Sequence, residues 1–219
     1  VLWDNLLVSN ATAGAEPKSP QVALADDGHY LVSWINEEHG YDSGRIEARL
    51  FRADGRPMSS QFAVTDASSP VYHGYYGMDM NGEGQFAFVW PEGVSGRRVY
   101  VQRYHADGTP LDAVAVPVGE EPSEHVLAVD VAMSPGGTAF AVWHAPTAHP
   151  SVNIGVVIQP DDPSPTVLLV DSISGTPRIA VDNNGLCVVA GSHSSGPPRA
   201  ALASFASTPS VVKSSFVLD

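Results

Sequence analysis

The sequence predicts an all-β protein built from four copies of a four-stranded antiparallel unit. An apolar phrase returns four times along the chain, as HYLVSW, QFAFVW, TAFAVW and LCVVAG. A glycine stands immediately before each phrase, and the spacings between these glycines are 56, 53 and 48 residues. A constant phrase at variable spacing is typical of a repeat architecture whose loops differ in length.

Each unit begins with a short alternating segment, which we interpret as its first strand. These segments are residues 21–26, 77–80, 127–133 and 178–182. The turns that follow read DDG, NGEG, SPGG and DNNG. Gly and Asn adopt positive φ at little cost, so these turns predict hairpins into the second strand. The second strand is the recurring phrase, which ends in tryptophan in three units and in Gly191 in the fourth.

Two further segments complete each unit. The third strand is predicted at 45–51, 98–104, 153–159 and 199–205, where polar and apolar residues alternate with period two. The fourth strand is predicted at 62–66, 114–118, 167–171 and 215–219. Four short strands in about 50 residues predict the blade of a β-propeller, in which neighbouring sheets cover the apolar second strand and its tryptophan fills the gap between them. A β-sandwich or an open stack of repeats is the alternative.

These repeats divide the chain into five segments of one domain. We expect repeats at 19–68, 69–119, 120–172 and 173–219, preceded by an outer strand and linker at 1–18. Residues 6–10, LLVSN, match the slot of a fourth strand. The four units could close a small ring by themselves, form part of a longer array, or join a second chain through this unmatched strand as a homo-oligomer.

Charge and composition exclude some classes of function. Eleven Lys and Arg stand against 24 Asp and Glu, a formal net charge of −13, which repels a nucleic-acid backbone or an anionic membrane. The apolar runs are too short for insertion in a membrane. The single cysteine, Cys187, lies in an apolar strand and is expected to be a small buried hydrophobe. An acidic chain rich in Gly, Pro, Ser and Asp is typical of bacterial secreted proteins.

The first two units resemble a repeat found in large bacterial secreted and surface proteins. The resemblance rests on VALADDGHYLVSW, RIEARLF, ADGRPMSSQFAVTD and RRVYVQRYHADGTPLDAVAV, and it covers about residues 19–118. That repeat has the pattern P-x-VA-x-x-DG-x-x-VV-x-W, then an I-x-x-Q-x-F strand, a D-x-x-G turn and an F-x-V-N-T strand. The resemblance implies a propeller-type module, secreted or on the cell surface, and brings no catalytic motif with it. The third unit lacks the glycine turn between its third and fourth strands, and the fourth unit lacks the tryptophan.

An aromatic cluster precedes the first strand of the second unit. Tyr72, His73, Tyr75 and Tyr76 lie together in SSPVYHGYYGMD. Aromatic faces with a polar rim suit stacking on a sugar ring, so this cluster is the leading ligand candidate. The competing interpretation is that the tyrosines pack between blades.

The loop INEEHGYDSG supplies a second group of candidates, chiefly Glu37 and His39. Its oxygen-rich side chains suggest calcium, but the spacing departs from the calcium-loop pattern, and we expect no cofactor. Carboxylates adjacent on one loop are poorly placed for glycoside hydrolysis, which needs two groups across the bond. His39, His144 and His193 fall in equivalent loops of three units and could share a rim.

The sequence therefore favours a non-catalytic extracellular module that binds a glycan or a protein through loops on one face of a propeller. Two alternatives remain. The repeats could be a structural or assembly element of a larger surface protein, or the chain could be a glycan hydrolase, for which the acidic loop is the sequence feature.

Overall fold

The computed structural model shows an all-β chain. It describes residues 6–10, 16–37, 44–66, 70–71, 75–92, 96, 98–120, 126, 128–145, 152–170, 175–193, 196–204 and 210–217. Within these ranges the chain forms four antiparallel sheets of four strands each. In every sheet the strands lie side by side in chain order, which is the arrangement that the repeats predict.

In the first two sheets, the second and third strands follow the predicted segments closely. The first sheet contains β1 (Glu16–Leu24), β2 (Tyr30–Glu37), β3 (Arg45–Phe51) and β4 (Phe62–Ala63). The second contains β5 (Gly77–Met80), β6 (Phe86–Glu92), β7 (Arg98–Tyr104) and β8 (Val116–Glu120).

The third and fourth sheets repeat this plan. The third contains β9 (Val129–Met133), β10 (Ala139–Ala145), β11 (Val152–Gln159) and β12 (Asp162–Val170). The fourth contains β13 (Pro177–Val181), β14 (Leu186–His193), β15 (Gly196–Ser204) and β16 (Ser210–Val217).

The glycine before each second strand makes the hairpin possible. Gly28, Gly84, Gly137 and Gly185 have φ between +80° and +87°, a left-handed conformation that glycine adopts without the steric cost of a Cβ. Each amide donates a hydrogen bond three residues back, as from Gly84 to the carbonyl of Asn81 at 2.9 Å. The hairpin prediction from the sequence is confirmed.

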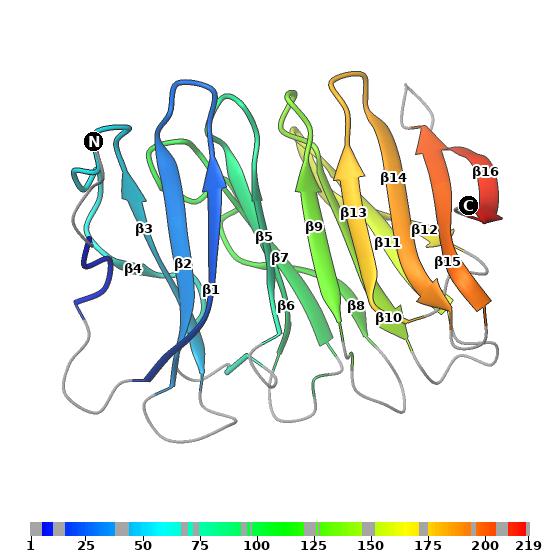
Figure 1. Ribbon diagram of the computed structural model, residues 1–219, viewed down its shortest axis with the longest axis horizontal. Helices are drawn as coiled ribbons and strands as arrows, with labels where there is room; N and C mark the ends of the chain where they lie inside the picture. Colours follow the sequence, from blue (N-terminus) through cyan, green and yellow to red (C-terminus); the bar gives the residue numbers. More distant parts are fainter. Residues whose placement is uncertain are drawn as a thin grey trace.

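The sheets stand in a row with their first strands innermost (Figure 1). β1 contacts β5, β5 contacts β9, and β9 contacts β13, so these strands line one axis as in a propeller. The row does not close into a ring, because the first and fourth sheets lie at its opposite ends (Figure 1).

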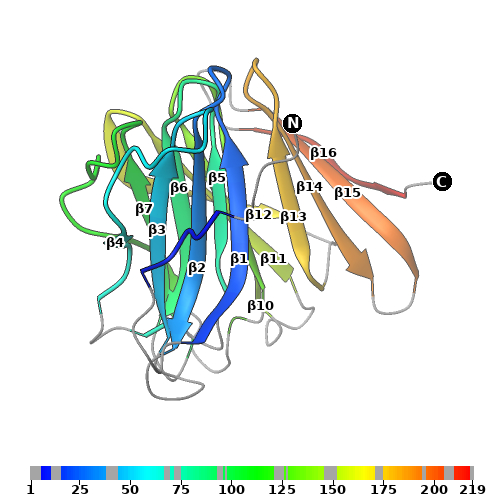
Figure 2. The same cartoon turned by 60° about the vertical axis from the view of Figure 1, so that its left-hand side comes forward.

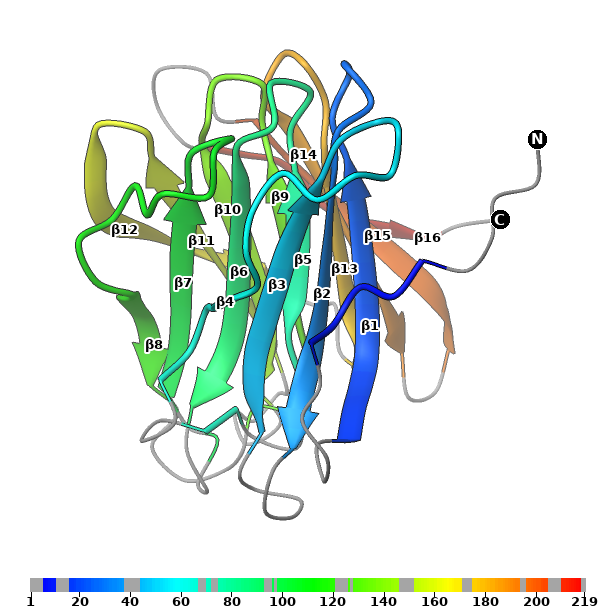
Figure 3. The same ribbon diagram turned by 90° about the vertical axis from the view of Figure 1, so that its left-hand side faces the viewer.

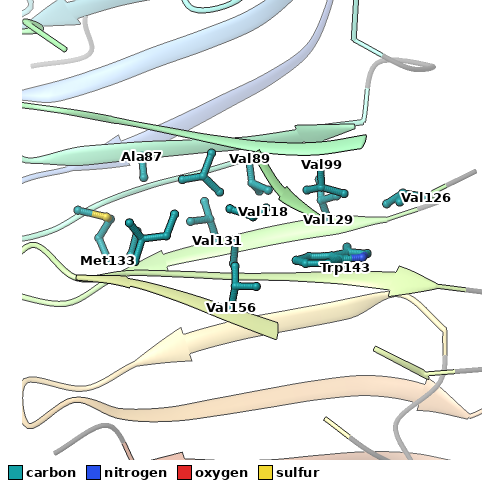
Figure 4. Close-up of a cluster of buried hydrophobic side chains, with 14 residues drawn as sticks. Ala87, Val89, Val99, Val118, Val126, Val129, Val131, Met133, Trp143 and Val156 are labelled. Atoms are coloured by element: carbon teal, nitrogen blue, oxygen red, sulfur yellow. The ribbon is translucent and has the colours of Figure 1, made fainter. Parts of the chain in front are cut away.

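The core lies between successive sheets. Trp143 of β10 is 1% exposed and packs with Val89, Val129 and Val131 between the second and third sheets (Figure 4). Trp90 fills the equivalent space between the first and second sheets and is 4% exposed. The expectation that the recurring tryptophan packs between blades is confirmed for Trp90 and Trp143. Trp34 is also buried, at 3% exposed, but it belongs to the first sheet and is in neither of these two core clusters.

Several outer segments differ from the sequence prediction. Residues 6–10 form no strand; they lie along the outside of the first sheet, where the amide of Asn10 donates to Oε1 of Gln61 at 2.8 Å (Figure 3). β4 has only two residues, whereas β12 begins at Asp162, five residues before the strand predicted at 167–171. Outer strands have one unpaired edge, so loop geometry as well as side-chain alternation decides their length.

Candidate functional site

The two ends of the sheets differ in their connections. The turns into β2, β6, β10 and β14 lie at one end, and the other end, where these strands finish, carries the connections that lead from each sheet to the next (Figure 1). We call the second the long-loop end. Glu37 and Tyr75 belong to this end, because Glu37 is the last residue of β2 and Tyr75 stands two residues before β5.

Some of these candidates lie outside the described residues. They are His39, Tyr72 and His73, together with most of the acidic loop that suggested calcium. His144 lies in β10, half-buried, and its amide donates to the carbonyl of Ala128 at 3.1 Å. Within the part of the chain that the structure describes, no three His, Cys, Asp or Glu side chains gather as metal ligands would.

Tyr76 is part of the core between the first and second sheets. Its ring is 6% exposed and lies 6.4 Å from that of Phe88. Its hydroxyl donates to the carbonyl of Ser19 at 2.8 Å and lies 3.0 Å from the hydroxyl of Ser33. Burial raises the pKa of this phenol to about 12. Tyr76 therefore has the packing role that the sequence analysis set against ligand binding, and its ring offers no open face to a sugar.

Tyr75, its neighbour, is 41% exposed. The connection that carries it is fixed to the first sheet, because the side-chain amide of Gln21 donates to the carbonyl of Tyr76 at 2.8 Å. The buried ring of Tyr76 and this hydrogen bond hold the backbone of Tyr75 in place. An aromatic side chain is thus presented to solvent from a fixed backbone.

Glu37, at the end of β2, is held by the ammonium group of Lys18 from β1. Its carboxylate lies 2.6 Å from Nζ of Lys18, and its side chain is 9% exposed against 41% for that of Lys18. A carboxylate in this environment is oriented and can accept hydrogen bonds from a ligand.

The backbone beside Lys18 is strained. The register between β1 and β2 shifts between Lys18 and Gln21, and Ser19 has φ of 51°, which is uncommon for a residue other than glycine. The hydrogen bond from Tyr76 to the carbonyl of Ser19 fixes this bulge. Strain held by surrounding structure is frequent at binding sites. We call Lys18, Ser19, Glu37 and Tyr75 the seam site.

The seam-site residues contribute one exposed aromatic ring, one cation and one oriented carboxylate at the same end of the first two sheets. This set matches a sugar, whose ring has an apolar face and whose hydroxyls both donate and accept hydrogen bonds. Glycoside hydrolysis needs a second carboxylate across the bond to be cleaved, and the described residues of the seam site supply only Glu37.

A hollow that the sequence analysis did not identify lies on the outer side of the second and third sheets. Its volume is about 500 Å³, and its lining includes Val114, Pro117, Pro163 and Ser164. Arg103 and Asp112 also line it, as a buried pair with Nη2 to Oδ1 at 2.7 Å and Nε to Oδ2 at 3.0 Å. The alternation of β7 contained the signal, because Arg103 has the same parity as the buried Val99 and Val101.

Comparison with known proteins identifies the fold only. No family model matches the sequence, and no curated protein matches it. The chain superposes on the crystal structure of the polysaccharide lyase Uly1 with a TM-score of 0.54 and 10% identity, over 88% of this chain and 48% of the lyase. It is also similar to a protein of unknown function from Dyadobacter fermentans DSM 18053, with a TM-score of 0.51 and 12% identity. This match covers 90% of this chain and 68% of that protein.

This chain thus spans about half the length of the lyase. Identities this low show a shared β-sheet architecture and do not assign a reaction. Among the described residues there is also no helix of the length and apolarity that a membrane crossing requires.

Proposed function

We propose that the chain is a non-catalytic binding module of a bacterial secreted or surface protein, and that it binds a glycan through the long-loop end of its blades. The observation that carries the proposal is the exposed side chain of Tyr75, on a connection that β1 holds through the hydrogen bonds of Gln21 and Ser19 with Tyr76. The Lys18–Glu37 pair lies at the same end of the first sheet. The net charge of −13 favours a neutral or basic ligand over nucleic acid.

Rigidity supports a binding role. Tyr76, the residue after Tyr75, is buried. It accepts a hydrogen bond from the side chain of Gln21 and donates one to the carbonyl of Ser19, and both of these residues belong to β1. A ligand that stacks on Tyr75 therefore meets a backbone that is already ordered, which lowers the entropic cost of binding. A protein surface could dock at the same place, and we expect the glycan screen to separate the two ligand classes.

The test is a glycan array followed by calorimetry with the best ligand. Tyr75→Ala removes the stacking face, and we expect the dissociation constant to rise about tenfold, since an aromatic contact contributes about 0.5–1.5 kcal/mol beyond its area. Val114→Ala is the control, because Val114 is 75% exposed on the outer side of the second sheet. Chelation with EDTA is expected to leave binding unchanged.

Two results would count against this proposal. Binding that Tyr75→Ala leaves intact would move the site away from the seam. Release of reducing sugar or of an unsaturated product from the bound glycan would show an enzyme.

A further inference from the structure

Two asparagines of the chain are followed by glycine, and the structure places them in opposite environments. Asn81–Gly82 lies in the turn between β5 and β6, and Asn184–Gly185 lies in the turn between β13 and β14. An Asn–Gly step is prone to deamidation, because glycine has no side chain to keep its amide nitrogen away from the side-chain carbonyl carbon of the asparagine. Whether this reaction occurs in a folded chain depends on how firmly the asparagine is held.

Asn81 is buried and its side chain is fully engaged. It is 4% exposed, and its Oδ1 accepts the amide hydrogen of Gln85 at 2.9 Å. Its Nδ2 donates to Oε1 of Gln85 at 3.1 Å and to the carbonyl of Ser134, in the third sheet's turn, at 3.0 Å. The side chain of Asn81 therefore reaches the nitrogen of Gly82 only if buried hydrogen bonds break, one of them between two sheets.

Asn184 is exposed in its turn, which projects at the top of the fourth sheet (Figure 2). Its Nδ2 donates to Oδ2 of Asp182 at 3.1 Å, and the amide of Gly185 donates to the carbonyl of Asp182 at 3.1 Å. A Cβ added to Gly185 would meet no described atom within 4 Å, so the space beside this residue is open. The reaction thus requires only hydrogen bonds inside an exposed turn to open, and such local openings need little free energy.

We propose that Asn184–Gly185 is a site of spontaneous covalent modification in the folded chain, and that the fold protects Asn81–Gly82. The amide nitrogen of Gly185 attacks Cγ of Asn184, and the new C–N bond closes a five-membered cyclic imide. The Cγ–Nδ2 bond breaks, and ammonia leaves with the proton of the Gly185 amide. Water then opens the imide at either of its carbonyls, which produces aspartate or isoaspartate at position 184.

Either product weakens the turn into β14. The hydrogen bond from Asn184 to Asp182 is replaced by a second carboxylate facing the first, and the two repel each other. Isoaspartate also adds a backbone carbon to a turn in which Gly185 has φ of +80°. Because β14 begins at Leu186 and carries the buried Cys187, we expect the modification to make this thiol more accessible.

Peptide mass spectrometry on the full chain, aged at mildly alkaline pH, tests the proposal. Asn183 is an internal control, because it is exposed beside Asn184 but is followed by asparagine. In the folded chain we expect a gain of one mass unit, together with isoaspartate, at Asn184 and at neither Asn81 nor Asn183. In guanidinium chloride the fold no longer protects Asn81, so Asn81 and Asn184 should convert at similar rates while Asn183 remains slower.

Asn184→Gln is the matched variant, because it keeps an amide but would need a larger ring to form the imide. We expect it to stay unmodified at position 184, and we expect Cys187 to be labelled more slowly in this variant than in the native chain after both have been aged. No conversion of Asn184 in the folded chain, or conversion of Asn81 at the same rate there, would overturn the proposal. Equal labelling of Cys187 in the two aged chains would overturn the inferred effect on the fourth sheet.

Discussion

At the scale of single residues, Arg103 and Asp112 form an ion pair withdrawn from water, with side chains 1% and 5% exposed. Asp112→Asn removes the negative charge and leaves a buried guanidinium uncompensated. We expect this change to lower the free energy of unfolding by about 3–5 kcal/mol, measured by urea denaturation.

The exposed Arg56–Asp54 pair is the matched control. Its side chains are 83% and 52% exposed, and its closest charged atoms are 3.8 Å apart. Asp54→Asn should therefore cost no more than about 1 kcal/mol. Equal losses in the two variants would show that burial of Arg103 does not determine the effect.

Asp79 gives a prediction for how the stability of the fold depends on pH. Its Oδ2 accepts the amide hydrogen of Met133 at 2.8 Å, across the boundary between the second and third sheets. Burial raises the pKa of this carboxyl above the ordinary value of 3.8. Because the folded chain holds the proton more tightly, the stabilising contribution is complete below the ordinary pKa and is lost as pH rises through the raised one.

Asp79→Asn keeps an oxygen that can accept the Met133 amide hydrogen and removes the buried charge. We expect its melting temperature to exceed that of the native chain at neutral pH, with the difference shrinking as pH falls through the raised pKa. The measurement is a series of thermal melts against pH.

The contribution of Asp182 to stability should depend on pH in the opposite direction. The amide of Leu186 donates to its carboxylate at 2.7 Å in an exposed turn, and this bond lowers the pKa of Asp182. Its contribution is present above the ordinary pKa and is lost as pH falls through the lowered one. Asp182→Asn is thus expected to melt below the native chain at neutral pH. A higher melting temperature for both variants would indicate a general effect of net charge.

At the scale of strands and sheets, close packing constrains the outer strand of the second sheet. A Cβ on Gly119 of β8 would lie 2.4 Å from Cζ2 of Trp143, which is almost completely buried. Gly119→Ala therefore forces the indole or the strand to move. We expect a loss of about 1–3 kcal/mol in unfolding free energy, measured by denaturation with urea.

Gly136→Ala is the control for that substitution. Its added Cβ would meet only the hydroxyl of Ser134, at 4.0 Å. The expected change is within about 0.5 kcal/mol. A comparable loss at Gly136 would mean that backbone entropy, and not contact with Trp143, explains the effect at Gly119.

The strands also show how far the sequence predicts this structure. Alternation and the turn glycines predict the sheets, because both depend on neighbouring residues. Tyr75 and Tyr76 are adjacent in an irregular connection, so no alternation indicates which of them points inward. The buried pair of Arg103 and Asp112 depends on how the loop after β7 folds back on that strand. The hydrogen bonds from Tyr76 to Ser19 and from Gln21 to Tyr76 join segments that are more than 50 residues apart in the sequence. Local patterns therefore do not predict these contacts.

At the scale of the whole molecule, the open row depends on the angles between packed sheets. Side-chain volumes set these angles, and the repeat pattern does not specify them. The repeat that lacks its tryptophan lies at one end of the row, where Gly191 stands in its place. The fourth sheet thus has less aromatic packing on one face, and among the described residues no sheet packs against the other, so we expect it to open before the rest.

Cys187 can measure this opening, because it is the only cysteine in the chain. It is 2% exposed against the third sheet, and burial raises the pKa of its thiol to about 12, so it should react only when the fourth sheet opens. We expect thiol labelling in urea to give an opening free energy below that of global unfolding measured by circular dichroism. A Cys187→Ala, Val89→Cys chain provides the comparison, since Val89 is fully buried between the second and third sheets and should be labelled only after global unfolding. Equal opening free energies at the two positions would show that all four sheets unfold as one unit.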